Sequence, residues 1–194
     1  VVLYSLKNKK TDDSKLTDIE KLIEGNKYFQ SKFGRDYRGY IENQKPHTAI
    51  LSCSDSRVPT ERIFNLAKGE IFVVREAGNI PDNVSIASLE YSVVVLGVKN
   101  LIVLGHTECC AVKAAKSGQD LGSIYLNNLA ENIRQNIKIE DDLDTSIINN
   151  AKASLLNLTT KSSIIRDAVN NNQINCYYGL YDISSGQVVF YKIN

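Results

Sequence analysis

The sequence predicts an α/β fold: a mainly parallel central sheet flanked by helices, with an antiparallel strand at its C-terminal edge. Two observations support this prediction. Short apolar runs alternate along the chain with longer segments of helical periodicity, as in proteins built from strand-helix-strand units. The last two apolar runs, 174–181 and 187–193, are separated by Ser184-Ser185-Gly186, and this turn is typical of an antiparallel hairpin.

Capping signals and apolar runs predict the elements of the first half of the chain. Residues 17–20, Thr-Asp-Ile-Glu, have the spacing of a capping box and start a helix that ends near Gly34. After a polar connection, residues 48–52 form a buried strand. Residues 59–66 form a short helix opened by a proline, which is tolerated in a first turn, and residues 71–74 form the second strand.

The second half continues the alternation of strands and helices. Residues 84–96 are apolar enough for a buried helix and lead into a third strand, 101–105. Residues 109–116 begin another helix. Acidic residues at 140–144 are interpreted as a solvated turn. Polar or acidic turns separate the remaining helices, which are predicted at 123–138, 145–158 and 162–170.

Length, charge and cysteine content limit the class of protein. The 194 residues fit a loose arm over 1–15 and a single domain over 16–194. Lysine plus arginine number 23 and aspartate plus glutamate 22, so no basic surface for nucleic acid is expected. Four cysteines in a chain of this size favour metal or catalytic use in a reducing compartment, the cytoplasm.

Membrane association is not expected, because no apolar window reaches the roughly 18 residues of a membrane span. The numbering starts at Val1 and not at methionine, so a targeting peptide removed from the mature protein is compatible with the sequence.

Reactive side chains follow two of the predicted strands. Cys53, Asp55 and Arg57 come directly after the first strand, and His106 and Cys109 come after the third. In an open parallel sheet, ligand sites lie beyond the carboxyl ends of strands near the point where strand order reverses, so these two loops are expected to converge. Two thiolates and one imidazole with an open fourth position are typical of catalytic zinc.

Two other interpretations of the same residues are open at this point. The cysteines are also compatible with small buried packing residues at strand ends, as we expect for Cys176 inside the strand 174–181. Alternatively, Cys53 is a nucleophile activated by Arg57, as in phosphate-handling cysteine enzymes. The short interval between these two residues and the anionic Asp55 within it disfavour a phosphate-binding loop.

The motifs resemble those of the β-class carbonic anhydrases. Residues 53–57, Cys-Ser-Asp-Ser-Arg, resemble the first zinc motif of that family, and residues 106–109, His-Thr-Glu-Cys, resemble the second. Cys110 stands where the family usually has glycine. The resemblance covers nearly the whole chain after residue 15 and also includes residues 24–26, 69–75, 77–79 and 88–91.

The resemblance implies a role for each residue of the two motifs. Cys53, His106 and Cys109 are expected to bind Zn²⁺, and Asp55 and Arg57 to form a catalytic dyad. Ionised Asp55 orients the attacking group by accepting its hydrogen bond. The resemblance also implies a closed state of the enzyme, in which the carboxylate of Asp55 becomes the fourth ligand of zinc.

By the same resemblance, the domain at 16–194 is expected to catalyse the reversible hydration of CO2 to bicarbonate and a proton through a zinc-bound hydroxide. It is expected to self-associate as a dimer or tetramer. In the loop after the second strand, Gly78 permits close backbone approach, so Gly78 and Asn79 are candidate substrate contacts. Two alternatives are a hydrolase of carbonyl sulfide or carbon disulfide with the same fold, and a non-catalytic zinc or redox protein.

Overall fold

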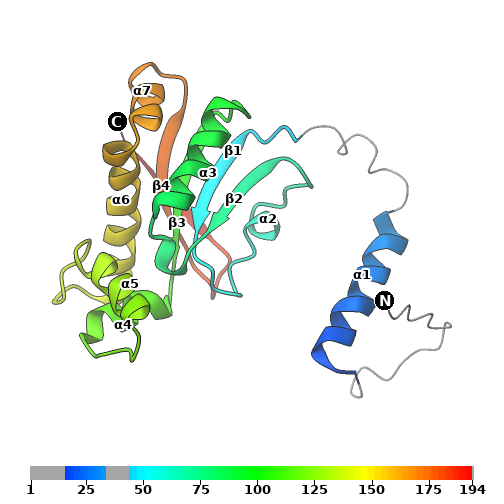
Figure 1. Cartoon of the computed structure of the whole chain (residues 1–194), viewed down its shortest axis with the longest axis horizontal. Helices are drawn as coiled ribbons and strands as arrows, with labels where there is room; N and C mark the ends of the chain where they lie inside the picture. The colour runs from blue at the N-terminus through cyan, green and yellow to red at the C-terminus, as the bar shows by residue number, and fades with distance from the viewer. Residues whose placement is uncertain (1–15, 34–43, 194) are drawn as a thin grey trace. The chain divides into compact units, whose positions relative to one another are not determined.

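The protein was analysed as a computed structural model that describes residues 16–33 and 44–193 (Figure 1). The chain divides into two units, residues 1–43 and 44–194. In the first unit, α1 spans Asp18–Phe33, and the carboxylate of Glu20 accepts hydrogen bonds from the backbone N–H and the hydroxyl of Thr17. This contact confirms the predicted helix start. The predicted arm at 1–15 and the helix end at Gly34 lie outside the described residues.

A five-stranded sheet forms the centre of the second unit, in the order β2-β1-β3-β4-β5. The pairs among β1 to β4 are parallel, and β4 pairs with β5 in antiparallel orientation. The predicted fold class is therefore confirmed, including the antiparallel edge strand. The strands are β1 (Thr48–Ser52), β2 (Ile71–Arg75), β3 (Asn100–His106), β4 (Asn175–Tyr181) and β5 (Val188–Lys192).

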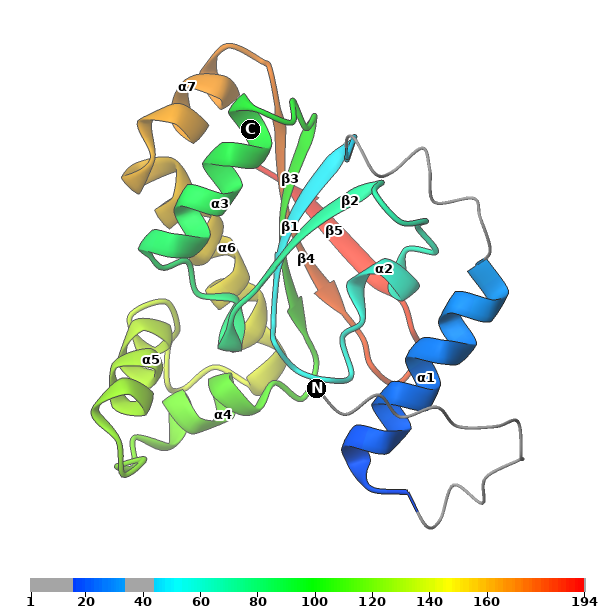
Figure 2. The same cartoon turned by 45° about the vertical axis from the view of Figure 1, so that its right-hand side comes forward.

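Three helices cover one face of this sheet: α3 (Asn83–Val94), α6 (Leu143–Lys161) and α7 (Ser163–Asn170) (Figure 2). Apolar side chains of these helices and of the central strands form the largest hydrophobic cluster. Helix α6 packs so closely on β3 that a Cβ added to Gly105 would lie 2.9 Å from Cγ2 of Ile147. Glycine at this position allows the helix to approach the strand that carries His106.

The start of α6 differs from the sequence prediction. The helix begins at Leu143 rather than at residue 145, because the side chain of Asp142 accepts a hydrogen bond from the backbone N–H of Thr145. The Asp141 carboxylate also accepts a hydrogen bond from the side chain of Asn149. The acidic segment is thus a helix cap with specific partners and not only a solvated turn.

Short helices surround the carboxyl ends of the parallel strands. Helices α4 (Cys110–Ser117) and α5 (Ile124–Arg134) lie at the end of the sheet to which β1 and β3 point (Figures 1 and 2). The short elements α2 (Thr60–Ile63) and η3 (Ala77–Asn79) follow β1 and β2. Helix α5 ends earlier than predicted. No helix in the described ranges 16–33 and 44–193 combines the length and the apolar character needed to cross a membrane.

Candidate metal centre

The candidate ligands lie where the order of the strands reverses. β1 pairs with β2 on one side and with β3 on the other, so the chain crosses over β1 between its second and third strands. Ligand sites of open α/β sheets are found beyond the carboxyl ends of strands at such a point. Ser52, the last residue of β1, is in register with Leu104 of β3, and this pairing places Cys53 and His106 at adjacent strand ends.

Cys53, His106 and Cys109 form a compact buried group, which is called the metal group below. The two sulfur atoms and a ring nitrogen lie within 4.8 Å of one another. The exposed fractions of the three residues are 5%, 0% and 1% in the same order. Ligands arranged tetrahedrally around an ion at bond lengths of about 2.0–2.3 Å have comparable separations. The sequence prediction that the two loops converge is confirmed, and the group has the donor atoms and spacing to hold a metal ion.

The hydrogen bond of His106 determines which ring nitrogen faces the sulfur atoms. Nδ1 lies 2.9 Å from the carbonyl oxygen of Thr107, to which it donates its proton. Nε2 is therefore the nitrogen with the free lone pair, and it is one of the few buried side-chain nitrogen or oxygen atoms in the described residues that have no hydrogen-bond partner. A buried acceptor without a donor next to two thiols fits a zinc ion, whose preferred ligands are nitrogen and sulfur.

The two thiols influence each other. Hydrogen bonding with Cys109 is the main cause that lowers the pKa of Cys53, and the same contact raises the pKa of Cys109. Burial opposes ionisation of both thiols. One thiolate therefore disfavours the other, and a divalent cation is needed to stabilise two adjacent thiolates in this buried place.

Asp55 and Arg57 form a bidentate ion pair beside the group. Nε of Arg57 donates to Oδ1 of Asp55 at 2.9 Å, and Nη2 donates to Oδ2 at 2.7 Å. The backbone N–H of Arg57 also donates to Oδ1, at 2.9 Å. These hydrogen bonds lower the pKa of Asp55 below its usual range, so the carboxylate is ionised at neutral pH. Oδ2 lies 3.9 Å from Nε2 of His106, which places the carboxylate next to the candidate ligands.

Comparison with known proteins identifies the family. Residues 48–188 match the sequence profile of the carbonic anhydrases. The chain belongs to the carbonic anhydrase family. The carbonic anhydrase of Pseudomonas aeruginosa is 32% identical over 173 residues, covering 78% of this chain and 76% of that protein. The carbonic anhydrase of Helicobacter pylori is 31% identical over 184 residues and covers 83% of each protein.

The solved structures place the fold within the β class of the family. The β-carbonic anhydrase of Coccomyxa, solved in complex with acetazolamide, superposes with a TM-score of 0.79. It is 26% identical, and the match covers 92% of this chain and 89% of that chain. The resemblance read from the two motifs is therefore confirmed.

Arg57 also connects the two motifs of the candidate metal centre. Its Nη2 donates to the carbonyl oxygen of Glu108 at 3.3 Å, and Glu108 lies between the candidate ligands His106 and Cys109. Glu108 adopts a φ of 60°, a left-handed conformation that is uncommon for residues other than glycine. The turn that brings the carbonyl toward Arg57 thus holds a strained backbone conformation beside the metal group.

Arg75 is a positioning residue that the sequence analysis missed. It ends β2, opposite Ser52 at the end of β1. Its Nε donates to the carbonyl oxygen of Cys53 at 3.2 Å, and its Nη2 donates to the carbonyl oxygen of Asp55 at 2.7 Å. Arg57 therefore holds the side chain of Asp55, while Arg75 holds the backbone of the same loop. The signals in the sequence were a cation directly after the predicted strand 71–74 and its place in the segment 69–75 of the family resemblance.

The loop after β2 contacts the metal group through its backbone. The N–H of Gly78 donates to Sγ of Cys53 at 3.3 Å, and the carbonyl of Gly78 accepts from Nδ2 of Asn150 at 2.8 Å. Gly78 has a φ of +66°, and an added Cβ would lie 2.7 Å from Cδ1 of Ile133. The backbone of Gly78 thus approaches the sulfur of a candidate ligand, and its contact with substrate stays a prediction. Asn79 is 1% exposed, and its contact with substrate stays a prediction.

Cys110 lies outside the metal group. It is the first residue of α4, its side chain is exposed, and its Sγ lies 4.0 Å from the carbonyl oxygen of Glu108. The thiol of Cys110 therefore adds no donor atom to the buried group formed by Cys53, His106 and Cys109.

Replacing Arg75 with alanine is expected to weaken zinc binding by roughly tenfold or more. Residues that hydrogen-bond to metal-site loops typically contribute 10- to 100-fold to metal affinity or activity. Arg75→Lys retains one donor and is expected to recover part of the loss. The measurement is the zinc dissociation constant in competition with a chelator, and Arg62→Ala in the neighbouring helix α2 serves as the control. Equal zinc affinity in Arg75→Ala and Arg62→Ala would contradict the positioning role.

Proposed function

We propose that the protein is a zinc-dependent enzyme that catalyses the reversible hydration of CO2 to bicarbonate and a proton. One observation supports this function above all: a buried Cys53-His106-Cys109 group lies beside a bidentate Asp55-Arg57 pair, in a chain of the carbonic anhydrase family.

Three residues would hold the zinc ion: Cys53 and Cys109 through Sγ, and His106 through Nε2. Three protein ligands leave a fourth position for a small molecule, as in catalytic rather than structural zinc sites. When bound there, zinc supplies a Lewis acid and lowers the pKa of a coordinated water molecule. The hydrogen bond from Nδ1 of His106 to Thr107 fixes the tautomer that this arrangement requires.

Asp55 orients the attacking oxygen. An ionised carboxylate can only accept hydrogen bonds, so its Oδ2 takes the hydrogen bond of the attacking group and turns a lone pair of that group toward CO2. Arg57 keeps the carboxylate in this orientation through three donors, two from its guanidinium and one from its backbone. Fixing the attacking group in one orientation lowers the entropic part of the barrier.

The surroundings of the group suit a small uncharged substrate. Cys53 and Cys109 belong to a hydrophobic cluster with Val112 and Ile133, and Ile80 and Ala111 pack against this cluster. Apolar walls favour CO2, which has no charge to neutralise, and they exclude excess water from the reaction.

The rate of CO2 hydration is expected to rise with pH and to level off at alkaline pH, because the attacking water must lose a proton. The titration of Asp55 adds no inflection to the pH dependence of this rate near neutral pH. Its pKa is lowered, so the ion pair is fully present above the usual carboxyl pKa of about 4 and is lost only as the pH falls through the lowered value. Stopped-flow rates between about pH 6 and pH 9 test this. A rate that is highest in acid and falls as pH rises would contradict the mechanism.

We also propose that the protein self-associates as a dimer or tetramer. The edge strand β5 exposes Val189, Phe190 and Tyr191 by 43%, 45% and 38% of their surfaces. An edge strand with apolar side chains and unpaired backbone groups favours association with another chain. Sedimentation velocity at several protein concentrations measures the assembly.

The free state of all four cysteines supports the expected cytoplasmic, reducing environment.

The decisive experiment combines metal analysis with a CO2 hydration assay on the same preparation. One zinc per chain together with rapid hydration supports the proposal. A parallel assay with carbonyl sulfide and carbon disulfide distinguishes the sulfur-compound hydrolase, which would use the same ligands. Zinc binding without turnover of any of the three substrates would favour the non-catalytic alternative.

A further inference from the structure

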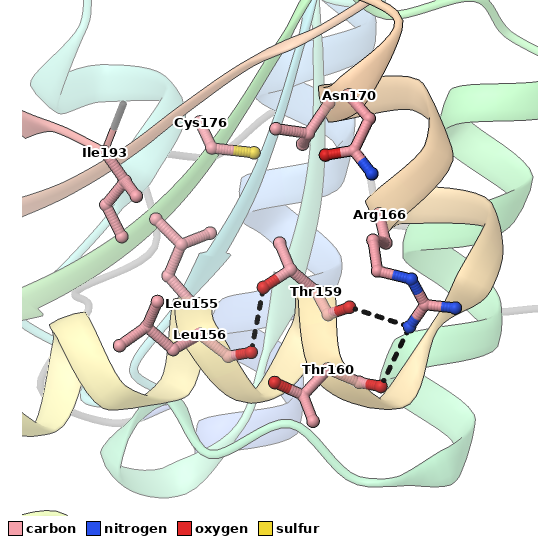
Figure 3. A pocket seen from close by; sticks show the side chains of 9 residues that line it. Leu155, Leu156, Thr159, Thr160, Arg166, Asn170, Cys176 and Ile193 are labelled. Carbon is pink, nitrogen blue, oxygen red and sulfur yellow. Dashed lines mark hydrogen bonds between the residues drawn. The ribbon is translucent and has the colours of Figure 1, made fainter.

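A cavity lies away from the metal group. It is bounded by α6, α7, β4 and the residue that follows β5, and its volume is about 420 Å³ (Figure 3). Cavities that bind small organic ligands typically measure about 300–1,000 Å³ and combine an apolar wall with a few polar groups. The size of this cavity falls within that range.

The cavity is separated from the metal centre by the length of β4. Cys176, which lines the cavity, pairs with Leu101 near the start of β3, whereas His106 pairs with Tyr181. This separation of five positions along β4 spans roughly 16 Å at about 3.3 Å per residue. A molecule in the cavity therefore does not contact the candidate zinc ligands.

One side of the cavity is apolar. Leu155 and Leu156 of α6 and Ile193 lie together on this side in Figure 3, and the sulfur of Cys176 points into the space beside them. Leu155 and Cys176 belong to the hydrophobic core and are 0% and 3% exposed. Burial raises the pKa of Cys176 to about 11, so its thiol is neutral near pH 7 and adds a polarisable apolar surface.

The other side carries one cation and several neutral polar groups. Nη1 of Arg166 donates to the carbonyl oxygens of Thr159 and Thr160, at 3.3 and 3.2 Å, in the last turn of α6. These two bonds orient the guanidinium, and within the described residues Nε and Nη2 have no protein acceptor. Asn170 lies on the same side in Figure 3. Within the part of the chain that the structure describes, no acidic side chain lines the cavity.

We propose that this cavity binds a medium-chain monocarboxylate. The carboxylate pairs with the free donors of Arg166, and the alkyl chain lies against Leu155, Cys176 and Ile193. A single guanidinium with free N–H groups on adjacent nitrogens matches one carboxylate in a bidentate arrangement. A phosphate or a dicarboxylate carries more charge than this lining neutralises, because Arg166 is the only lysine or arginine among the described residues that line the cavity.

Isothermal titration of the zinc-loaded full chain with octanoate, hexanoate and butanoate tests the proposal. Each buried methylene is expected to strengthen binding about fourfold, so octanoate should bind roughly 15-fold more tightly than hexanoate. Octanamide, which has the same chain without the charge, should bind at least about tenfold more weakly than octanoate. Equal affinities across the series, or equal binding of octanamide and octanoate, would overturn the proposal.

A pair of arginine variants locates the site. Arg166→Gln is expected to weaken octanoate binding at least about tenfold, and Arg166→Lys to retain part of it. Arg134→Gln is the matched control, because Arg134 also donates to a helix carbonyl, that of Ala115, but does not line the cavity. Thermal unfolding of each variant shows whether the fold is intact. If Arg166→Gln is folded and binds octanoate as tightly as Arg134→Gln, the cavity is not the site.

A competition experiment separates this cavity from the metal centre. Octanoate binding is measured with the zinc site saturated by azide, a small anion that coordinates metals. Unchanged octanoate affinity is expected. Loss of binding in azide would show that the carboxylate sits on the metal, and this outcome would overturn the proposal. None of these measurements depends on CO2 hydration. Failure of this proposal can therefore be distinguished from failure of the proposed function.

Discussion

Replacement of Cys53 by serine is expected to abolish zinc binding and CO2 hydration. The serine hydroxyl does not ionise near neutral pH, so the buried group would retain one sulfur and one nitrogen ligand in place of three. Changes to residues outside the ligand set typically cost 10- to 100-fold, and removal of a ligand should exceed about 100-fold in both zinc affinity and activity. Zinc per chain is measured by mass spectrometry of the metal, and activity by stopped flow.

Cys110→Ser is the matched control for this experiment. It makes the same change at an exposed cysteine that adds no donor atom to the buried group. Zinc content and activity of Cys110→Ser are expected to equal those of the parent. If Cys53→Ser retained one zinc per chain and parent activity, the assignment of the ligands would be wrong.

Replacement of Arg57 by alanine is expected to reduce activity on the order of 100-fold while the zinc content stays unchanged. Asp55 would lose the two hydrogen bonds from the guanidinium and keep only the backbone N–H. Charge-assisted bidentate pairs are among the strongest hydrogen bonds in proteins, so their loss frees the carboxylate to turn toward the divalent ion. A carboxylate on the metal would occupy the position that the attacking water needs.

Spectroscopy of the metal distinguishes this outcome from simple unfolding. X-ray absorption of the zinc, or the visible spectrum after cobalt substitution, should show an additional oxygen ligand from protein in Arg57→Ala. The double variant Arg57→Ala with Asp55→Asn removes the carboxylate and should lack this ligand. If Arg57→Ala hydrates CO2 at the parent rate, the pair has only a structural role.

The strands and both motifs were predictable because they depend on local sequence. The predicted strand 48–52 matches β1 residue for residue, since its apolar centre at 49–51 is typical of a strand buried on both faces. The convergence of Cys53 with His106 also followed from sequence, through the rule that places sites at the carboxyl ends of strands.

Contacts that depend on tertiary geometry were not predictable. The two hydrogen bonds of Arg75 to backbone carbonyls and the bond of Gly78 to the sulfur of Cys53 join segments that are distant in sequence. Any exposed arginine or loop glycine gives the same local pattern. The start of α6 was misplaced for a different reason: Asp142 lies in a run of acidic residues, and composition alone does not show which of them caps the helix.

The pairing of β1 with β3 would couple the proposed metal binding to the order of folding. The candidate ligands come from two segments that β1 and β3 bring together over about 50 residues, as in the register Ser52↔Leu104. Contacts of such sequence separation form late relative to local helices, because the loop between them must close first. A partly synthesised or partly folded chain holds only one thiol, or one thiol with an imidazole, and binds zinc weakly. A metal bound at this group would thus report the pairing of β1 with β3, and its binding energy would stabilise that pairing rather than any single segment.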